Sequence, residues 1–133
     1  MKLTALLKIG IVVGLVMNVL DFIVQGNLLA GMFAAVPAFR QTTEMLPYLI
    51  VGDFVAGLVF AWAFLKLGSA AGHGVAGGAT FGLYAGVLIG FPTYIFVHLL
   101  LNGVPYGLMW VLTIYTALVY VVLGAVAGAL HKA

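Results

Sequence analysis

The first candidates for chemistry are the few polar side chains that lie inside long apolar stretches. Of 133 residues, only five are Lys or Arg and three are Asp or Glu. A carboxylate or an imidazole can exchange a proton or bind a cation, and such groups within a membrane commonly mark a functional site. The candidates for a binding or proton-exchange site are Asn18, Asp21, Gln25, Asp53, Tyr94 and His98.

Three of these candidates share one side of a helix. Asn18, Asp21 and Gln25 follow one another at intervals of three and four residues, which is the helical repeat. Lipid offers no hydrogen-bond partner to a carboxylate, so Asp21 and Asp53 are expected to face other helices. They could form an interhelical clasp, a site for a transported species, or a contact with another subunit.

Other kinds of reactive site find no support in the sequence. The chain has no cysteine, which excludes disulfides, thiolate metal sites and thiol nucleophiles. The two acids and His98 could ligate a metal in principle, but no HExxH or ExxH pattern accompanies them. The glycine-rich segment 71–78 leads into a helix, yet it lacks the Lys-Ser/Thr ending of a phosphate-binding P-loop. We therefore expect no metal, no cofactor and no enzyme active site.

Hydropathy identifies the elements that must position the candidate residues. Apolar residues make up 65% of the chain and charged residues 6%, with a mean hydropathy of +1.29. In soluble domains, apolar residues make up about 45–50% and charged residues about 25%. The composition of this chain therefore excludes a soluble enzyme, a disordered chain and a nucleic-acid binder.

A spanning helix needs about 20 apolar residues. Four stretches qualify, at residues 3–30, 46–67, 74–102 and 106–130. The sequence predicts an all-α, four-helix transmembrane bundle with up-down-up-down order, in one domain over residues 1–133.

The basic residues predict how the bundle is oriented. Lys2, Lys8, Lys66 and Lys132 fall on one side of the membrane, and Arg40 alone falls on the other. Because lysine and arginine favour cytoplasmic loops, both termini are expected in the cytoplasm. This topology describes a multi-pass integral membrane protein.

This orientation also predicts on which side of the membrane two further parts of the chain lie. The loop at residues 31–45 faces outward and is rich in apolar side chains, so we expect it to lie along the interface or to fold back over the helix ends. His73 and His131 lie at cytoplasmic helix ends, where we expect them to be solvated.

Counting residues gives an expected depth for each candidate. At about 1.5 Å per residue, Asp21 lies about 20 Å beyond Lys8, and Asp53 lies about 10 Å from the outer end of its span. His98 lies about one turn from the outer end of the third span, with Tyr94 one turn deeper. We therefore expect both acids within one helical turn of the same depth, with His98 on the adjoining outer rim.

Regular glycine spacing predicts close helix packing. In lipid, small residues let helix backbones approach one another, and this approach promotes association. Glycine recurs at every fourth position in the third span and again in the fourth. We expect a glycine zipper in which Gly82 and Gly86 face another helix, in this chain, a second copy or another protein. The expected packing residues are Gly74, Gly78, Gly82, Gly86, Gly90, Gly124 and Gly128.

The second half of the chain resembles a group of uncharacterised four-span membrane proteins of bacteria. The resemblance rests on residues 82–92, on the Leu-Asn-Gly-Val-Pro turn at 101–105, and on the glycine-ended fourth span at 124–128. It implies a four-helix fold and a bacterial origin, and with the orientation above it implies a place in the bacterial inner membrane. It implies no activity and no site residue.

These observations leave functions of different classes open. The first is a packing or accessory subunit of a membrane complex, or a self-associating bundle, with the lipid bilayer and further membrane subunits as partners. The alternative is a small channel or carrier for protons, cations or a compact solute that uses Asp21, Asp53 and His98. A third is an enzyme, or a quinone- or lipid-binding protein, that uses the same polar layer as a proton donor.

Overall fold

The computed structural model describes residues 1–39 and 42–131, and these residues form helices joined by short turns. Two single-turn extensions, η1 and η2, follow the first and second long helices. The elements in chain order are α1 (Leu3–Ile23), η1 (Val24–Leu28), α2 (Ala30–Ala34), α3 (Leu46–Leu67), η2 (Gly68–Ala71), α4 (Gly74–Leu100) and α5 (Tyr106–Leu130). The all-α fold predicted from the sequence is therefore confirmed.

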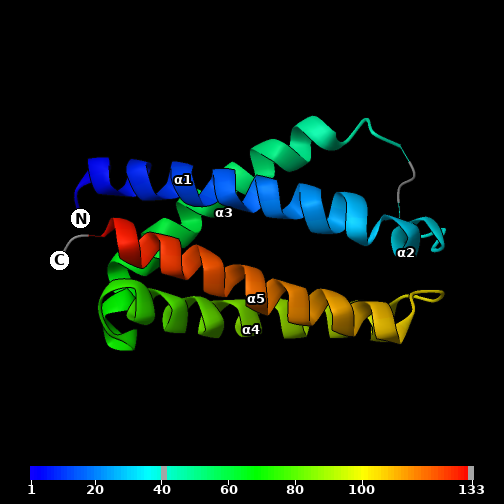
Figure 1. Cartoon of the computed structure of the whole chain (residues 1–133). Helices are drawn as coiled ribbons and strands as arrows, with labels where there is room; N and C mark the ends of the chain where they lie inside the picture. The colour runs from blue at the N-terminus through cyan, green and yellow to red at the C-terminus, as the bar shows by residue number, and fades with distance from the viewer. Residues whose placement is uncertain (40–41, 132–133) are drawn as a thin grey trace.

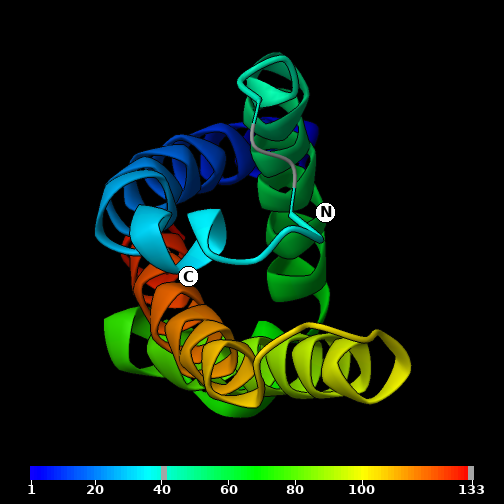
Figure 2. The same ribbon diagram turned by 90° about the vertical axis from the view of Figure 1, so that its right-hand side faces the viewer.

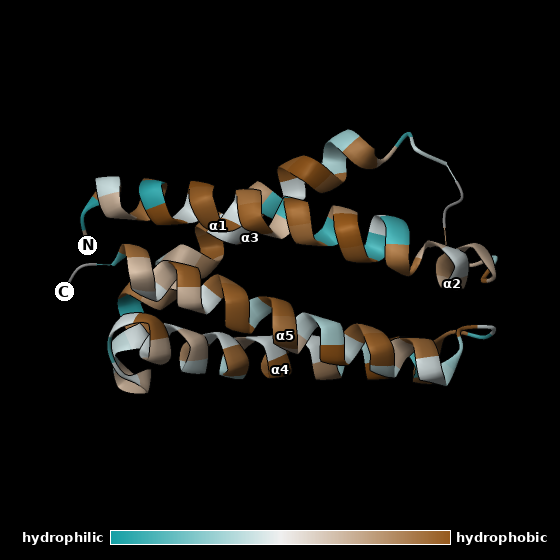
Figure 3. Ribbon diagram, viewed as in Figure 1, coloured by the Kyte–Doolittle hydropathy of each residue, from teal (hydrophilic) through white to brown (hydrophobic). Residues whose placement is uncertain are grey.

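Four helical stretches are long and apolar enough to cross a membrane. They cover Leu3–Leu28, Leu46–Ala71, Gly74–Leu100 and Tyr106–Leu130, and Figure 3 shows apolar residues along all four. The chain is a small, multi-pass integral membrane protein. Arg40 and Lys132, which entered the prediction of orientation, lie outside the described residues.

The bundle is built from two antiparallel pairs of helices. α4 packs along α5 over nearly its whole length, and α1 packs against α3. The start of α1 and the end of α5 lie at the same end of the bundle, as an even number of spans requires (Figure 1). We call this the terminal end, and the end that carries α2 and the α4–α5 turn the α2 end.

Glycine allows α4 and α5 to approach closely. A Cβ atom added at Gly86 would lie 2.8 Å from the Cα of Ala117, and one at Gly90 would lie 3.1 Å from the Cβ of Thr116. At Gly78 and Gly82 the added atom would meet the backbone carbonyls of Gly124 and Tyr120. The partner of this glycine row is therefore a helix of the same chain.

Gly74 differs from the other glycines of the row. A Cβ there would meet nothing within 4 Å, and its φ of +65° lies in the left-handed region. Its carbonyl still lies against Gly128. Gly74 is therefore favoured by the shape of the turn before α4, and it presents no packing face of its own.

The crossing of α1 and α3 also depends on glycine. A Cβ atom at Gly57 would lie 2.6 Å from both the carbonyl oxygen of Gly10 and the backbone nitrogen of Gly14. Beyond this crossing α3 diverges, and at the α2 end it stands away from the α4–α5 pair (Figure 2). The four helices therefore pack tightly only in the terminal half of the bundle.

The buried apolar residues of the bundle form two separate clusters. The larger occupies the terminal half and consists of Ile9, Val13, Phe60, Ala61, Phe64, Val119, Tyr120, Leu123 and Ala127. The smaller consists of Val36, Val104, Leu108, Met109 and Leu112. Because Val36 packs beside residues of α5, the segment after α2 folds back over the helix ends, which was one of the two expectations for this loop.

Candidate functional site

Asp21 is the centre of the polar contacts between helices. Its Oδ1 accepts a hydrogen bond of 3.0 Å from Nε2 of Gln25, one turn further along. The same oxygen accepts a hydrogen bond of 2.6 Å from the hydroxyl of Tyr115 on α5. Hydrogen bonds to a carboxylate are stronger than those between neutral groups. Asp21 thereby links the two helix pairs of the bundle.

Asn18 makes the corresponding link from α1 to α3. Its Nδ2 donates to the carbonyl of Gly14, at 3.0 Å, and to the carbonyl of Ile50, at 3.2 Å. The spacing of Asn18, Asp21 and Gln25 thus becomes a polar stripe that contacts α3 on one side and α5 on the other.

Asp53 faces the same region without a direct partner. It is half-buried on α3, and its carboxylate makes no hydrogen bond within residues 1–39 and 42–131. It is close enough to Asp21 for their charges to interact. At 100° per residue, Asp53 lies on nearly the same face of α3 as Gly57 and Phe64, which point into the bundle.

The two acids lie further apart in depth than the residue count predicted. A Cβ at Gly14 would lie 3.2 Å from the backbone carbonyl of Asp53, which places that residue opposite Gly14. Asp21 is seven residues further along α1, about 10 Å or two turns at 1.5 Å per residue. The difference arises because the glycine crossing at Gly57 fixes how far α3 slides along α1.

His98 and Tyr94 do not join the carboxylates. Nδ1 of His98 lies 2.9 Å from the carbonyl of Val104, and its ring lies 4.7 Å from that of Tyr106. His98 therefore ties the end of α4 to the turn that follows it. Tyr94 packs against the smaller apolar cluster.

Tyr115 is the member of the site that sequence reasoning missed, and Tyr120 lies near it. Both hydroxyls lie within the electrostatic field of Asp21 and Asp53. A signal for Tyr115 was present in the sequence. It lies nine residues before Gly124, which corresponds to the opposite side of the helix at 100° per residue. Once Gly124 faces α4, Tyr115 must face away from α4, toward α1.

The arrangement favours proton sharing and helix clasping over metal chemistry. No group of three or more His, Asp or Glu residues in the described part of the chain could hold a metal ion. Asp21, Tyr115 and Gln25 form a connected set of hydrogen-bonding groups. Beyond them, toward the terminal end, lies the larger apolar cluster, in which Tyr120 carries a hydroxyl among otherwise apolar side chains.

Comparison with known proteins gives no relative from which a role could be transferred. No family model, curated protein or solved structure matches this chain.

Proposed function

We propose that this protein is a packing subunit of the membrane, which associates with a second copy or with another membrane polypeptide through the half of α3 nearest its N-terminus. The observation that carries the proposal is Asp53. Its carboxylate is half-buried at membrane depth and has no hydrogen-bond partner among the described residues. A polar donor from a partner helix would satisfy it.

The surroundings of Asp53 support the same proposal. Every residue from 46 to 52 is exposed, with Tyr48 at 71% and Leu49 at 61%. Residues 46–52 cover almost two turns of helix, and within one chain this part of α3 meets α1 through the bond from Asn18 to Ile50 while much of its side-chain surface stays exposed. A largely exposed apolar helix surface is available to pack against another helix.

Gly52 adds a feature that lipid alone does not explain. Glycine in a helix interior costs about 1 kcal/mol relative to alanine, so it is favoured where a backbone must approach. Most other glycines within the long helices meet backbone or side-chain atoms, whereas a Cβ at Gly52 would meet nothing within 4 Å. With Ala56 one turn later, Gly52 forms a small-residue step that a partner helix could occupy.

We place the protein in the bacterial inner membrane with its terminal end in the cytoplasm. Support for this orientation comes from Lys2, which directly precedes α1, and from Lys8 and Lys66, which lie in the terminal halves of α1 and α3.

Mass measurement in mild detergent tests the proposal. We expect native mass spectrometry to show two or more copies, or a stoichiometric complex with unrelated subunits. Gly52→Ile and Asp53→Leu should each shift the mass toward the monomer while the helical content is retained. Gly107→Leu is the matched control, because a Cβ at that helical glycine also meets nothing within 4 Å.

Cross-linking distinguishes self-association from a complex with another protein. The chain has no native cysteine, so a single Leu49→Cys variant reports only on its own position. Disulfide-linked dimers of this variant, absent for Leu88→Cys on α4, indicate a second copy. A wild-type protein that is monomeric in several mild detergents and forms no cross-link in membranes would refute the proposal.

Proton or cation transport is the second candidate function. The observation that favours it is the connected group of Gln25, Asp21 and Tyr115, with the charge of Asp53 nearby. A transport cycle would have to open the apolar cluster that closes the terminal half.

The variant Asp21→Asn separates the two candidates. An amide oxygen can still accept from Tyr115, so a clasp should lose little stability. A transport site should lose proton- or cation-coupled flux in vesicles while its assembly stays intact. Wild-type vesicles without any such flux would exclude transport.

A further inference from the structure

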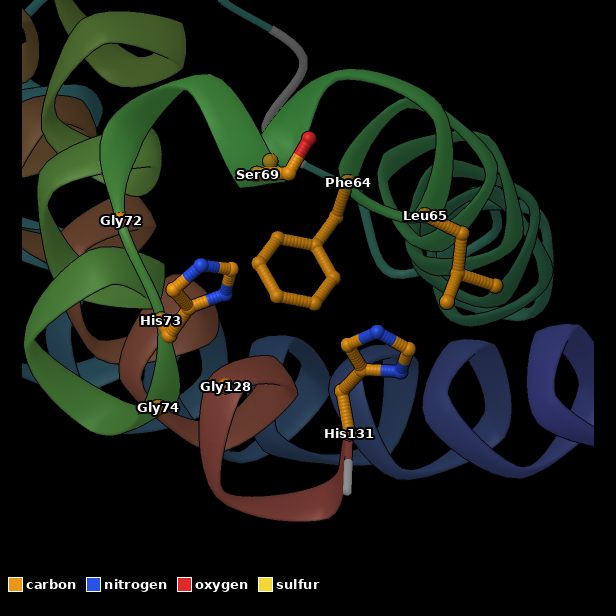
Figure 4. A pocket seen from close by; sticks show the side chains of 9 residues that line it. Phe64, Leu65, Ser69, Gly72, His73, Gly74, Gly128 and His131 are labelled. Atoms are coloured by element: carbon orange, nitrogen blue, oxygen red, sulfur yellow. The ribbon is translucent and has the colours of Figure 1, made fainter. Parts of the chain in front are cut away.

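The terminal end contains a cavity that lies away from the polar layer around Asp21. Its volume is about 130 Å³, and it lies between the end of α3, the start of α4 and the end of α5. Figure 4 shows the ring of Phe64 between His73 and His131 inside this space. A cavity needs only about 10–15 Å³ of such volume for one water molecule, so this one could hold a group of several oxygen atoms.

Part of the cavity wall consists of bare backbone. Gly72, Gly74 and Gly128 line it without side chains. Gly72 and Gly74 have φ of +112° and +65°, so the turn between α3 and α4 takes a shape that other residues rarely adopt. A Cβ at Gly77 would meet the backbone of Gly72, which shows that this turn folds tightly onto the first turn of α4.

Two side chains supply hydrogen-bond donors to this space. They are the imidazoles of His73 and His131, whereas the hydroxyl of Ser69 points away from them (Figure 4). The His131 ring packs edge-on against Phe64 with centroids 5.8 Å apart, which holds one donor in place. Both histidines are exposed at helix ends, as the sequence predicted, and the fold brings them to one cavity.

The charges of the chain favour an anion at this end. The three acids are Asp21, Glu44 and Asp53, and none lies in the terminal half. Lys8 lies on the other side of His131, where it lines a second hollow that His131 shares. A site that has a basic side chain nearby and no Asp or Glu in the same half of the bundle attracts negative charge.

We propose that this cavity binds a phosphate group, carried by an anionic lipid headgroup or present as free phosphate. His73 and His131 donate hydrogen bonds to the phosphate oxygens. The glycine backbone lets the group approach closely, and Lys8 supplies positive charge nearby. The first turn of α4, where the backbone N–H groups of Gly74, Val75 and Ala76 point toward this end, adds a favourable dipole. This proposal does not depend on association through α3.

Binding of phosphatidylglycerol to the purified, delipidated protein tests the proposal. We expect native mass spectrometry to show retained phosphatidylglycerol in preference to phosphatidylcholine, and the thermal unfolding midpoint to rise with it. His73→Ala should weaken this binding about tenfold, since a hydrogen bond to a charged group typically contributes at least that factor. His73 is exposed, so its removal leaves the fold intact. His131→Ala should have a similar effect.

Two control variants separate this site from general attraction of the basic end for anions. Lys66→Gln removes a charge at the same end from a residue that does not line the cavity. His98→Ala removes a histidine at the α2 end. Both variants should bind phosphatidylglycerol as the wild type does. Equal weakening by Lys66→Gln and His73→Ala would overturn the proposal, as would binding of both lipids with the same affinity when free phosphate has no effect.

Competition with inorganic phosphate shows whether the bound phosphate group belongs to a lipid headgroup or to free phosphate. If free phosphate stabilises the protein and competes with phosphatidylglycerol, the ligand is a soluble phosphate. If it has no effect while phosphatidylglycerol binds through His73 and His131, the ligand is a lipid headgroup. If neither phosphate nor phosphatidylglycerol depends on the two histidines, the proposal is refuted.

Discussion

Asp21 and Tyr115 are 94 positions apart in the chain and are joined by a hydrogen bond of 2.6 Å between the carboxylate and the hydroxyl. This bond connects α1 to α5, and therefore connects the two helix pairs. The pairs otherwise meet mainly through apolar side chains of the terminal half. The bond is the polar link between the pairs nearest to the region where α3 diverges.

Removing the hydroxyl should weaken the junction between the pairs. We expect Tyr115→Phe to lower the free energy of unfolding by about 1 kcal/mol, because interhelical hydrogen bonds in membranes contribute about that much. Unfolding by SDS titration in mixed micelles measures the change. Tyr84→Phe is the control, since Tyr84 is 64% exposed on α4. Equal losses from both variants would show that the Asp21 bond contributes no specific stability.

A single methyl group at Gly82 should disturb the α4–α5 contact. The added Cβ would meet the carbonyl of Tyr120, which is backbone and cannot turn aside. We expect Gly82→Ala to cost about 1–3 kcal/mol, as overpacking does in tightly packed interiors. Gly107→Ala should be neutral or stabilise the helix by up to about 1 kcal/mol, because its Cβ enters open space. Thermal unfolding in detergent compares the two, and an unchanged midpoint for Gly82→Ala would contradict the close approach.

Asn18 should contribute to the position of α3. Its amide bonds to the carbonyl of Ile50, so Asn18→Leu leaves the α1–α3 contact to the glycine crossing and to apolar packing. We expect a loss of about 1 kcal/mol, the usual net value of a hydrogen bond. Asn27→Leu is the control, because that amide bonds only to Phe22 in its own helical segment. SDS titration measures both variants, and the prediction fails if their losses are equal.

The orientation in the membrane is tested by cysteine labelling in intact cells. Asn102 and Ser69 lie near opposite ends of α4, and both are exposed. A membrane-impermeant maleimide should label Asn102→Cys directly and Ser69→Cys only after permeabilisation. The reverse pattern would place the phosphate-binding cavity on the outer side.

Much of the fold could be predicted from the sequence, because each span is longer and more apolar than any soluble helix requires. Hydropathy predicted four spans that agree with the structure to within a few residues, except that the first is interrupted after Ile23 by a π-helical turn. The row from Gly78 to Gly90 also predicted close packing on one face of α4. These patterns follow from the helical repeat, so they can be recognised in the sequence without knowing which helices pack against one another.

The sequence by itself therefore determined the class of protein, the number of spans and which face of each helix is polar or small. Only the tertiary structure decided that Gly82 meets α5, that Tyr115 bonds to Asp21, and that His98 binds its own turn. The physical reason is that lipid is as apolar as the helix surfaces, so burial of apolar area does not select which helices meet. That selection depends on backbone approach at glycines and on a few hydrogen bonds, which act only after the helices are placed side by side. His73 and His131 share a cavity for the same reason.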